Sequence, residues 1–214
     1  MIKACIFDLD GVIVDTAKYH YIAWKDLAHE MNFDFTKKEN ERLKGVSRMD
    51  SLDILLEIGH IQKTPLEKEH LAAKKNENYR SHILNLTPEE ILPGAAAFLK
   101  DCRDNNIATV LGSASKNAMT ILSRLQITHL FDVIIDGTKT TKAKPDPEVF
   151  LKGAEELDIP PANCVVFEDA QAGIEAALAA GMKCIGIGDP KTLIKANFVI
   201  DGLHQMNIQH LYNL

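Results

Sequence analysis

The chain has 214 residues, a formal net charge of −6 and a hydrophobic fraction of 46%. The acidic balance argues against a nucleic-acid-binding protein, whose surface usually carries a basic stripe, and the ordinary hydrophobic content argues against disorder. The length is sufficient for one large core with a smaller inserted domain. A small anionic substrate stays compatible with this charge, because a few local cations or a bound Mg²⁺ can outweigh the overall field.

Two further patterns bear on the cellular location of the protein. No stretch approaches the roughly 20 apolar residues of a membrane span, and no signal-peptide pattern precedes the first strand. The four cysteines show no CxxC spacing and lie in or beside apolar segments, so we expect reduced, packed thiols. We therefore expect a cytoplasmic protein. The cysteines are Cys5, Cys102, Cys164 and Cys184.

The first predicted element is an apolar strand that begins at Lys3 and ends in two carboxylates, Asp8 and Asp10. An apolar run of this kind is typical of a buried parallel strand. Because side chains alternate along a strand, the two carboxylates can point to the same side. They repel each other unless a cation lies between them or one of them holds a proton. Either arrangement indicates chemistry rather than scaffolding.

The next seventy residues carry helical spacing only. The pattern predicts a first helix from Thr16 to Met31, with Thr16 as a plausible N-cap. Three more predicted helices follow without an intervening strand, which indicates a compact all-helical insert. They span approximately Thr36 to Leu43, Ser47 to Ile58 and Pro65 to Leu84.

From Pro93 onward, predicted strands and helices alternate, which indicates a parallel sheet with helices on both faces. The first strand belongs to this sheet, so the helical block is inserted between the first strand and the second. The predicted strands are Ile107–Leu111, Val133–Ile135, Cys164–Phe167, Lys183–Ile187 and Phe198–Ile200. The predicted helices lie near Ala95–Asn105, Lys116–Leu125, Pro147–Leu157, Gln171–Ala180 and Gln205–Leu211.

Polar clusters follow four of these strands. In an open parallel sheet, the strands deliver such residues to one edge, where ligands bind. Acids, hydroxyls, a helix N-terminus and a lysine at one point favour a phosphate and Mg²⁺ site. The clusters are Asp8 with Asp10, Gly112 to Asn117, Lys142 to Pro145, and Glu168 with Asp169.

Each cluster also has a structural explanation when taken alone. An aspartate after a strand is usually a turn or cap residue, and Ser113 and Ser115 could cap the helix that follows them. Lys144 could be a solvated loop residue. Glu168 and Asp169 could begin a helix, where negative charge favours the helix dipole. The order and position of the four clusters carry the functional interpretation.

The segment from Phe7 to Val12, with Ser113, Lys144-Pro145 and Glu168-Asp169 in that order, resembles the four motifs of the haloacid dehalogenase (HAD) superfamily of phosphotransferases. The resemblance covers essentially the whole chain. It implies an α/β fold, in which a Rossmann-like parallel-sheet core carries an inserted all-helical cap. The core would comprise residues 1–15 and 88–214, and the cap residues 16–87.

For the core, the resemblance implies phosphoryl transfer through an aspartyl phosphate. Asp8 would be the nucleophile and Asp10 the acid and base, and one Mg²⁺ per chain would offset the negative charge. Ser113 and Lys144 would stabilise the transition state. The metal site would be formed by Asp8, Asp10, through its backbone carbonyl, Glu168 and Asp169. Gly112 and Ala170 depart from the usual alanine and serine by small-for-small changes.

For the cap, the resemblance is to members that isomerise hexose phosphates. It implies interconversion of β-D-glucose 1-phosphate and glucose 6-phosphate, with glucose 1,6-bisphosphate as primer and intermediate. Thr16 would be a hinge between the domains, and Arg48 would hold the phosphate that is not reacting. The implied substrate-binding residues are His20, Trp24, Lys44, Gly45, Val46, Ser47, Arg48, Ser51, Lys75, Ser113, Ala114, Ser115, Lys116 and Asn117.

Some of these cap residues also fit ordinary structural roles. A histidine on a helix is usually a surface or core residue, a lone Trp24 is usually core, and Lys75 could belong to a solvated face with Lys74. Two alternative functions remain: a Mg²⁺-dependent sugar-phosphate phosphatase with the same core, and a non-catalytic sugar-phosphate sensor. The expected partners are small sugar phosphates, with no nucleic acid and no membrane, and the expected state is a monomer.

Overall fold

The computed structural model describes residues 1–43 and 47–214. The chain divides into two compact units, which are described separately below. The core unit comprises Met1–Asp15 and Leu86–Leu214, and the helical unit comprises Thr16–Asn85. Three predicted substrate-binding residues, Lys44, Gly45 and Val46, lie outside the described residues.

The core unit is built on a parallel six-stranded sheet with the order β3-β2-β1-β4-β5-β6. This confirms the predicted α/β fold with a Rossmann-like parallel sheet. The first strand lies inside the sheet, where Phe7 is in register with Leu111 of β2 and Phe167 of β4. The strands are β1 (Ala4–Phe7), β2 (Ala108–Gly112), β3 (Val133–Ile135), β4 (Cys164–Glu168), β5 (Lys183–Ile187) and β6 (Phe198–Ile200).

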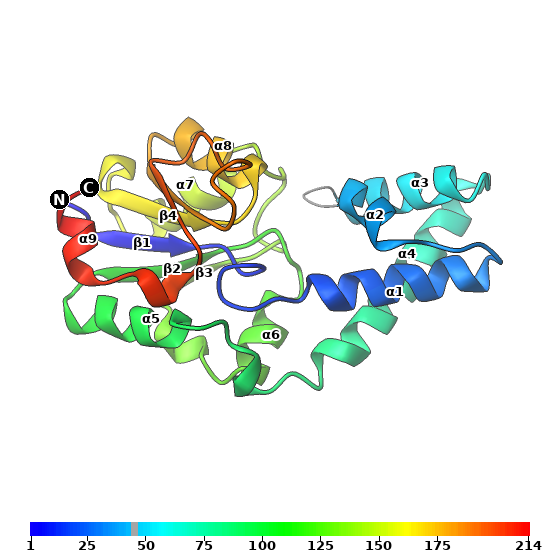
Figure 1. Cartoon of the computed structure of the whole chain (residues 1–214), viewed down its shortest axis with the longest axis horizontal. Helices are drawn as coiled ribbons and strands as arrows, with labels where there is room; N and C mark the ends of the chain where they lie inside the picture. Colours follow the sequence, from blue (N-terminus) through cyan, green and yellow to red (C-terminus); the bar gives the residue numbers. More distant parts are fainter. Residues whose placement is uncertain (44–46) are drawn as a thin grey trace. The chain divides into compact units, whose positions relative to one another are not determined.

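Apolar side chains cover both faces of this sheet, and aromatic rings are concentrated on one of them. On one face, Ile6 and Val166 pack with Phe150 of α7 (Glu148–Glu156) and Ile174 of α8 (Gln171–Ala179). The other face carries aromatic rings, among which Phe7 stacks on Phe167 with centroids 4.8 Å apart. Figure 1 shows α7 and α8 on one side of the sheet and α5 (Ala95–Asp104) on the other. Burial on both faces explains the continuous apolar runs of the strands.

The remaining helices of the core unit are short. They are α6 (Ala118–Arg124) and α9 (Ile208–Tyr212), and short 3₁₀ turns precede several elements. The last helix begins later in the chain than predicted, because Leu203–Gln205 forms a separate 3₁₀ turn and Asn207 then caps α9. Helix α6 also begins later than predicted, at Ala118, because the preceding residues form a tight loop held by two serine side chains.

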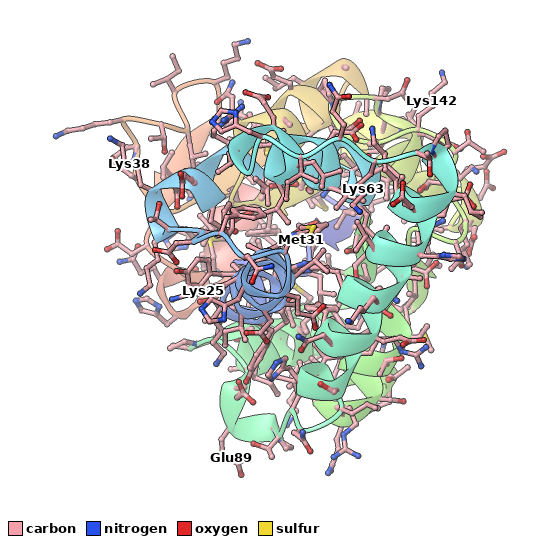
Figure 2. All side chains as sticks on the ribbon, turned by 90° about the vertical axis from the view of Figure 1, so that its right-hand side faces the viewer. Lys25, Met31, Lys38, Lys63, Glu89 and Lys142 are labelled. Carbon is pink, nitrogen blue, oxygen red and sulfur yellow. The ribbon has the colours of Figure 1, made fainter. Side chains whose placement is uncertain are left out.

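Over residues 16–43 and 47–85, the helical unit shows four α-helices, as the spacing predicts. They are α1 (Ala17–Glu30), α2 (Lys37–Asn40) with a 3₁₀ turn at Glu41–Leu43, α3 (Arg48–Ile58) and α4 (Pro65–Ile83). Side chains at Thr36, Ser47 and Thr64 cap α2, α3 and α4, and two of these form complete capping boxes. The interior holds Trp24, Leu27, Phe35, Leu52 and Leu55 among other apolar residues. Figure 2 looks at this unit along α1 and shows Lys25 and Lys38 on its outside.

Thr16 differs from its predicted role as an N-cap. It occupies the N-cap position of α1, but its side chain makes no capping hydrogen bond. Its hydroxyl instead pairs with the Tyr79 hydroxyl at 3.0 Å inside the helical unit. Across the described residues, no helix is long and apolar enough to cross a membrane.

Candidate active site

The candidate site lies at the carboxyl edge of the parallel sheet in the core unit. Asp8 directly follows β1, Ser113 follows β2, and Glu168 is the last residue of β4, with Asp169 next. The backbone N–H of Asp8 still donates to the carbonyl of Phe167 in β4, which holds the acid against the neighbouring strand. Parallel strand order therefore brings together three of the four predicted motif positions.

The fourth motif position, Lys144, joins two of these acids. Its Nζ donates to Oδ1 of Asp8 at 2.5 Å and to Oε1 of Glu168 at 2.6 Å. The side chains of Lys144, Asp8 and Glu168 are only 11%, 12% and 2% exposed, so little solvent screens these ion pairs. Burial opposes the charged form of Lys144, but the two carboxylates outweigh it and raise the pKa of Lys144 above its usual value.

Negative charge nevertheless exceeds positive charge at this edge. Burial and the neighbouring carboxylates of Asp8, Glu168 and Asp10 raise the pKa of Asp169 to about 8. Burial also raises the pKa of Glu168, against the effect of Lys144. Two acids, Asp8 and Glu168, contact Lys144, and Asp10 and Asp169 add negative charge nearby, which is the electrostatic situation in which a cation binds or a carboxyl holds a proton.

Two glycines allow the acids to approach the backbone closely. At Gly11, φ is +77°, and a Cβ atom would overlap the carboxylate of Asp169. At Gly173 on α8, a Cβ atom would overlap the carboxylate of Glu168. Glu168 also accepts a hydrogen bond from the N–H of Ala170 at 2.8 Å, so a backbone group fixes one of its oxygens. Any larger residue at either glycine would displace an acid.

The loop from Ser113 to Asn117 is held by a succession of local hydrogen bonds. The Ser113 hydroxyl accepts from the N–H of Ser115 at 3.1 Å, and the Ser115 hydroxyl accepts from the N–H of Asn117 at 3.2 Å. The N–H of Gly137, from the loop after β3, donates to the Ser115 carbonyl at 3.2 Å. Ser113 is buried, whereas Ala114 and Lys116 are exposed. Loops of this kind can present N–H groups and hydroxyls to phosphate oxygens.

The donor atoms of these acids bear on whether the edge can bind magnesium. Hard carboxylate oxygens suit Mg²⁺, and the raised pKa of Asp169 reflects its burial together with negative charge that Lys144 leaves uncompensated. Among the described residues, no three His, Cys, Asp or Glu side chains already form a metal-ligand cluster. Part of the reason is that the Lys144 ammonium lies against Asp8 and Glu168. The donor types fit Mg²⁺, although they are not arranged around one point.

In the helical unit, two predicted substrate-binding residues, His20 and Trp24, lie against a third, the buried cation Lys75. Lys75, 3% exposed, places Nζ 2.7 Å from Nδ1 of His20 and 4.5 Å from the ring centroid of Trp24. Lys75 is therefore buried, and its structural interpretation as part of a solvated face is wrong. Burial, with Lys75 and Arg48 as neighbouring cations, holds the pKa of His20 well below its usual range.

The other predicted residues of this unit lie around the start of α3. Ser47 is its N-cap: the hydroxyl accepts from the N–H of Asp50 at 3.2 Å and donates to the Asp50 carboxylate at 2.7 Å. Arg48 is the first residue of α3 and is an exposed residue, although partial burial lowers the pKa of its guanidinium. Ser51, one turn further on, is 4% exposed.

Sequence reasoning missed several residues that shape the site. Gly173 lies within a helix, where nothing in the sequence pattern marks contact with an acid. Gly137 follows Asp136, and an Asp-Gly pair after a strand is a turn signal that could have been used. The glycine at position 112 has a packing reason, because a Cβ atom there would lie 2.9 Å from the ring of Phe150 and 3.1 Å from Ile6.

Comparison with known proteins places this geometry in a family. Residues 2–181 match the family model described as haloacid dehalogenase-like hydrolase. The chain is 43% identical to a β-phosphoglucomutase of Bacillus subtilis over 98% of this chain and 94% of the relative. A crystal structure of β-phosphoglucomutase from Clostridium difficile matches with a TM-score of 0.93 at 46% identity, over 100% of this chain and 96% of that one.

A second kind of relative shares the same architecture. The chain is 31% identical to a phosphorylated carbohydrates phosphatase of Thermotoga maritima, with 92% of each chain covered. The family model and both relatives cover most of the chain. The chain therefore belongs to the haloacid dehalogenase-like hydrolase family.

Proposed function

We propose that the protein is a β-phosphoglucomutase, an isomerase that interconverts β-D-glucose 1-phosphate and D-glucose 6-phosphate. The observation that carries this proposal is the 43% identity to a β-phosphoglucomutase over 98% of the chain. The core geometry alone supports phosphoryl transfer, which mutases and phosphatases share. The identity extends through the helical unit, where the two activities are expected to differ.

In the proposed reaction, Asp8 is the nucleophile. One of its carboxylate oxygens attacks phosphorus, the bond from phosphorus to the sugar oxygen breaks, and Asp8 becomes an aspartyl phosphate. Asp10 gives a proton to the departing sugar oxygen and later takes one from the hydroxyl that collects the phosphoryl group. Transfer to the 6-hydroxyl of glucose 1-phosphate yields glucose 1,6-bisphosphate. Its 1-phosphate then returns to Asp8 and leaves glucose 6-phosphate.

Charge on the moving phosphoryl group is offset by residues already in place. Lys144, 2.5 Å from Oδ1 of Asp8, and the Ser113 hydroxyl would bind the equatorial oxygens, with the N–H of Ala114 as a further donor. Asp8, Asp169, the Asp10 carbonyl and Glu168 would hold Mg²⁺, and the bound ion would supply positive charge that offsets the negative charge of the reacting groups. Asp8 and Glu168 also keep Lys144 charged for this role.

The residues that bind the sugar and the second phosphate would determine which hydroxyl group receives the phosphoryl group. In the helical unit, His20 would bind the sugar, Trp24 and Ser51 would shape its pocket, and the Arg48 guanidinium would hold the non-reacting phosphate. Thr16 is the proposed hinge, and the helical and core units are the proposed cap and core domains. Further proposed contacts come from Lys44, Gly45, Val46, Ser47, Lys75, Ser115, Lys116 and Asn117.

Two finer points belong to the same proposal. We assign the protein to the cytoplasm because its cysteines are free and buried, and such thiols persist in a reducing compartment. We assign a monomeric state because every residue given a role lies in one chain. Small sugar phosphates are the only partners that the mechanism needs.

The second candidate is a Mg²⁺-dependent sugar-phosphate phosphatase. The 31% identity to a phosphorylated carbohydrates phosphatase over 92% of the chain favours it specifically. In that reaction, water rather than a sugar hydroxyl would attack the aspartyl phosphate. Because Asp8, Asp10 and Lys144 serve both reactions, the two candidates differ only in the acceptor.

The deciding experiment measures both products from one reaction. Purified protein is given α- or β-glucose 1-phosphate with Mg²⁺, with and without glucose 1,6-bisphosphate, and both glucose 6-phosphate and inorganic phosphate are measured. A mutase forms glucose 6-phosphate from the β anomer faster than it releases phosphate, and the bisphosphate accelerates the reaction. Faster release of phosphate in the presence of primer would instead establish the phosphatase.

A further inference from the structure

Tyr79 is a fully buried residue of α4 to which no role has been assigned above. Its ring stacks on the imidazole of His20, with centroids 3.9 Å apart and an angle of 29° between the planes. Its hydroxyl is hydrogen-bonded to Oγ1 of Thr16 at 3.0 Å. The tyrosine thus contacts one residue through its ring face and another through its tip, and both lie at the start of α1.

Lys75, one helical turn before Tyr79, completes the arrangement around His20. Its Nζ lies 2.7 Å from Nδ1 of His20 and 5.1 Å from the ring centroid of Tyr79. An ammonium group can only donate a hydrogen bond, so Nδ1 must accept one and carries no proton. The low pKa of His20 keeps the imidazole neutral. The remaining ring proton is therefore on Nε2, where it can be donated to a ligand oxygen.

We propose that Tyr79 is a positioning residue that holds the His20 imidazole in one orientation and in the Nε2–H tautomer. Its relevance to catalysis rests on the proposed function, in which His20 binds the sugar. A half-turn of the imidazole about its bond to Cβ would place a carbon atom where Lys75 needs an acceptor. The ring of Tyr79, anchored at its hydroxyl by Thr16, packs along the imidazole face and opposes such a turn.

This arrangement has a consequence for the proposed reaction. A histidine that alternates between two tautomers presents a donor for only part of the time, whereas a fixed Nε2–H is a permanent donor. Preorganised donors contribute to catalysis because they need no rearrangement when the substrate arrives. Tyr79 would therefore act on the sugar through His20, without touching the substrate itself.

The tautomer can be measured directly in the intact protein. Nitrogen-15 NMR of the imidazole distinguishes a protonated from an unprotonated ring nitrogen, and His20→Gln assigns the signal. At pH 7.5 we expect Nδ1 of wild-type His20 to be unprotonated and Nε2 to be protonated. In Tyr79→Leu, which removes the ring, we expect both tautomers to be populated. A wild-type signal from the Nδ1–H form, or an unchanged spectrum in Tyr79→Leu, would overturn the proposal.

Because Tyr79 is fully buried, its removal could unfold the protein, and two further variants guard against this. Tyr79→Met refills the volume with a flexible apolar chain and should give the same mixed tautomers. Tyr79→Phe keeps the ring and loses only the bond to Thr16, so it should retain the Nε2–H form and lose activity only about threefold. The matched control is Phe35→Leu, which alters another fully buried ring of this unit, packed on Tyr21, and should leave the His20 signal unchanged.

A double-mutant cycle then separates positioning from general stability. Tyr79→Leu should lower kcat/KM for glucose 6-phosphate formation by about 10- to 100-fold, the range expected when a binding group is misplaced. In the His20→Gln background the same change should cost less than about twofold, because the group that it positions is already gone. Fully additive losses would show that Tyr79 does not act through His20. The NMR result needs no turnover, so a protein without mutase activity would refute the proposed function alone.

Discussion

The ammonium of Lys144 lies 2.5 Å from Oδ1 of Asp8, and both side chains are nearly nine-tenths buried. The same ammonium reaches Glu168 at 2.6 Å, so one lysine compensates two acids from different strands. Little water can enter to screen these charges, and their interaction is correspondingly strong. The proposed nucleophile therefore lies beside a cation that a phosphoryl oxygen can also use.

Replacing Asp8 tests the covalent mechanism. Asp8→Ala should lower the rate of glucose 6-phosphate formation by at least about 10⁴-fold, because no other group can accept the phosphoryl group in its place. The coupled assay measures the rate, and circular dichroism checks that the fold is retained. Asp104→Asn, an exposed acid at the end of α5, is the control and should behave as wild type. An active Asp8→Ala protein would refute an aspartyl phosphate on this residue.

Replacing Lys144 should damage both activity and stability. Lys144→Ala leaves two buried carboxylates without their cation, and breaking such pairs typically costs about 3–5 kcal/mol. The loss of a transition-state donor should also lower kcat by about 10²- to 10³-fold. Urea unfolding and the coupled assay measure the two effects. Lys142→Ala removes a side chain that is 67% exposed in the same loop and should change stability by less than about 0.5 kcal/mol. Equal effects of the two variants would contradict the ion-pair argument.

Magnesium should stabilise the folded protein as well as support turnover. A ligand that binds only the native state at 100 times its Kd adds about 2.7 kcal/mol to the free energy of unfolding. We expect the Tm to rise with Mg²⁺ concentration and turnover to stop in excess EDTA. Asp169→Asn should abolish most of the Tm increase. Asp189→Asn, an exposed acid after β5, should leave the increase intact. A wild-type Tm that does not change with Mg²⁺ concentration would argue against binding of this metal.

The buried His20 predicts a dependence of stability on pH. Burial, Lys75 and Arg48 lower its pKa in the folded state, whereas the unfolded chain has the ordinary value near 6.5. Below that value the unfolded state binds more protons than the folded state, so the free energy of unfolding should fall by up to about 1.4 kcal/mol per pH unit. The loss begins as the pH drops through about 6.5 and continues toward the folded-state pKa.

Urea unfolding between pH 7.5 and 5.5 measures this dependence, and His20→Gln is the control. Because glutamine does not titrate, the variant should lose less stability over the same interval than the wild type. The difference between the two slopes isolates His20 from the other seven histidines. Parallel slopes would mean that His20 is not held neutral in the folded state.

Arg48 tests how the acceptor is chosen. Arg48→Ala should strongly reduce glucose 6-phosphate formation, by about 10²-fold, while some hydrolysis of the aspartyl phosphate survives. Arg48→Lys should recover only part of the rate, because a lysine cannot form the two parallel hydrogen bonds of a guanidinium. Glucose 6-phosphate and inorganic phosphate are measured together. An unaffected mutase rate in Arg48→Ala would contradict the assigned role.

Much of the fold could be predicted because its signals are local. Apolar runs such as Cys164–Phe167 indicate buried parallel strands, and capping residues such as Thr64 mark helix starts. The neighbours of each strand could not be predicted in this way. Nothing in a four-residue segment such as β1 records that it pairs with β2 on one side and β4 on the other. That information lies in packing between segments far apart in the chain.

The site divides in the same manner. Acids after strands were visible as a pattern, because parallel strands deliver them to one edge. The burial of Lys75 was not visible, since two adjacent lysines on a helix are usually solvated. Its contacts with Tyr79 on the same helix and with His20 and Trp24 on α1 form only in the folded unit. The contact of Gly173 with Glu168 also depends on how α8 meets its strand. Such features follow from tertiary packing, which no short window of sequence contains.

The central place of β1 in the sheet also bears on how the chain folds as it is synthesised. This strand is made before its two partners, β2 and β4, which begin only at Ala108 and Cys164. The helical unit, by contrast, is complete in the unbroken stretch Thr16–Asn85 and can form from contacts close in sequence. On the ribosome, the segment that carries Asp8 therefore cannot pair with both neighbouring strands until β4 has been synthesised. The nucleophile reaches its final surroundings only when Glu168 has been synthesised.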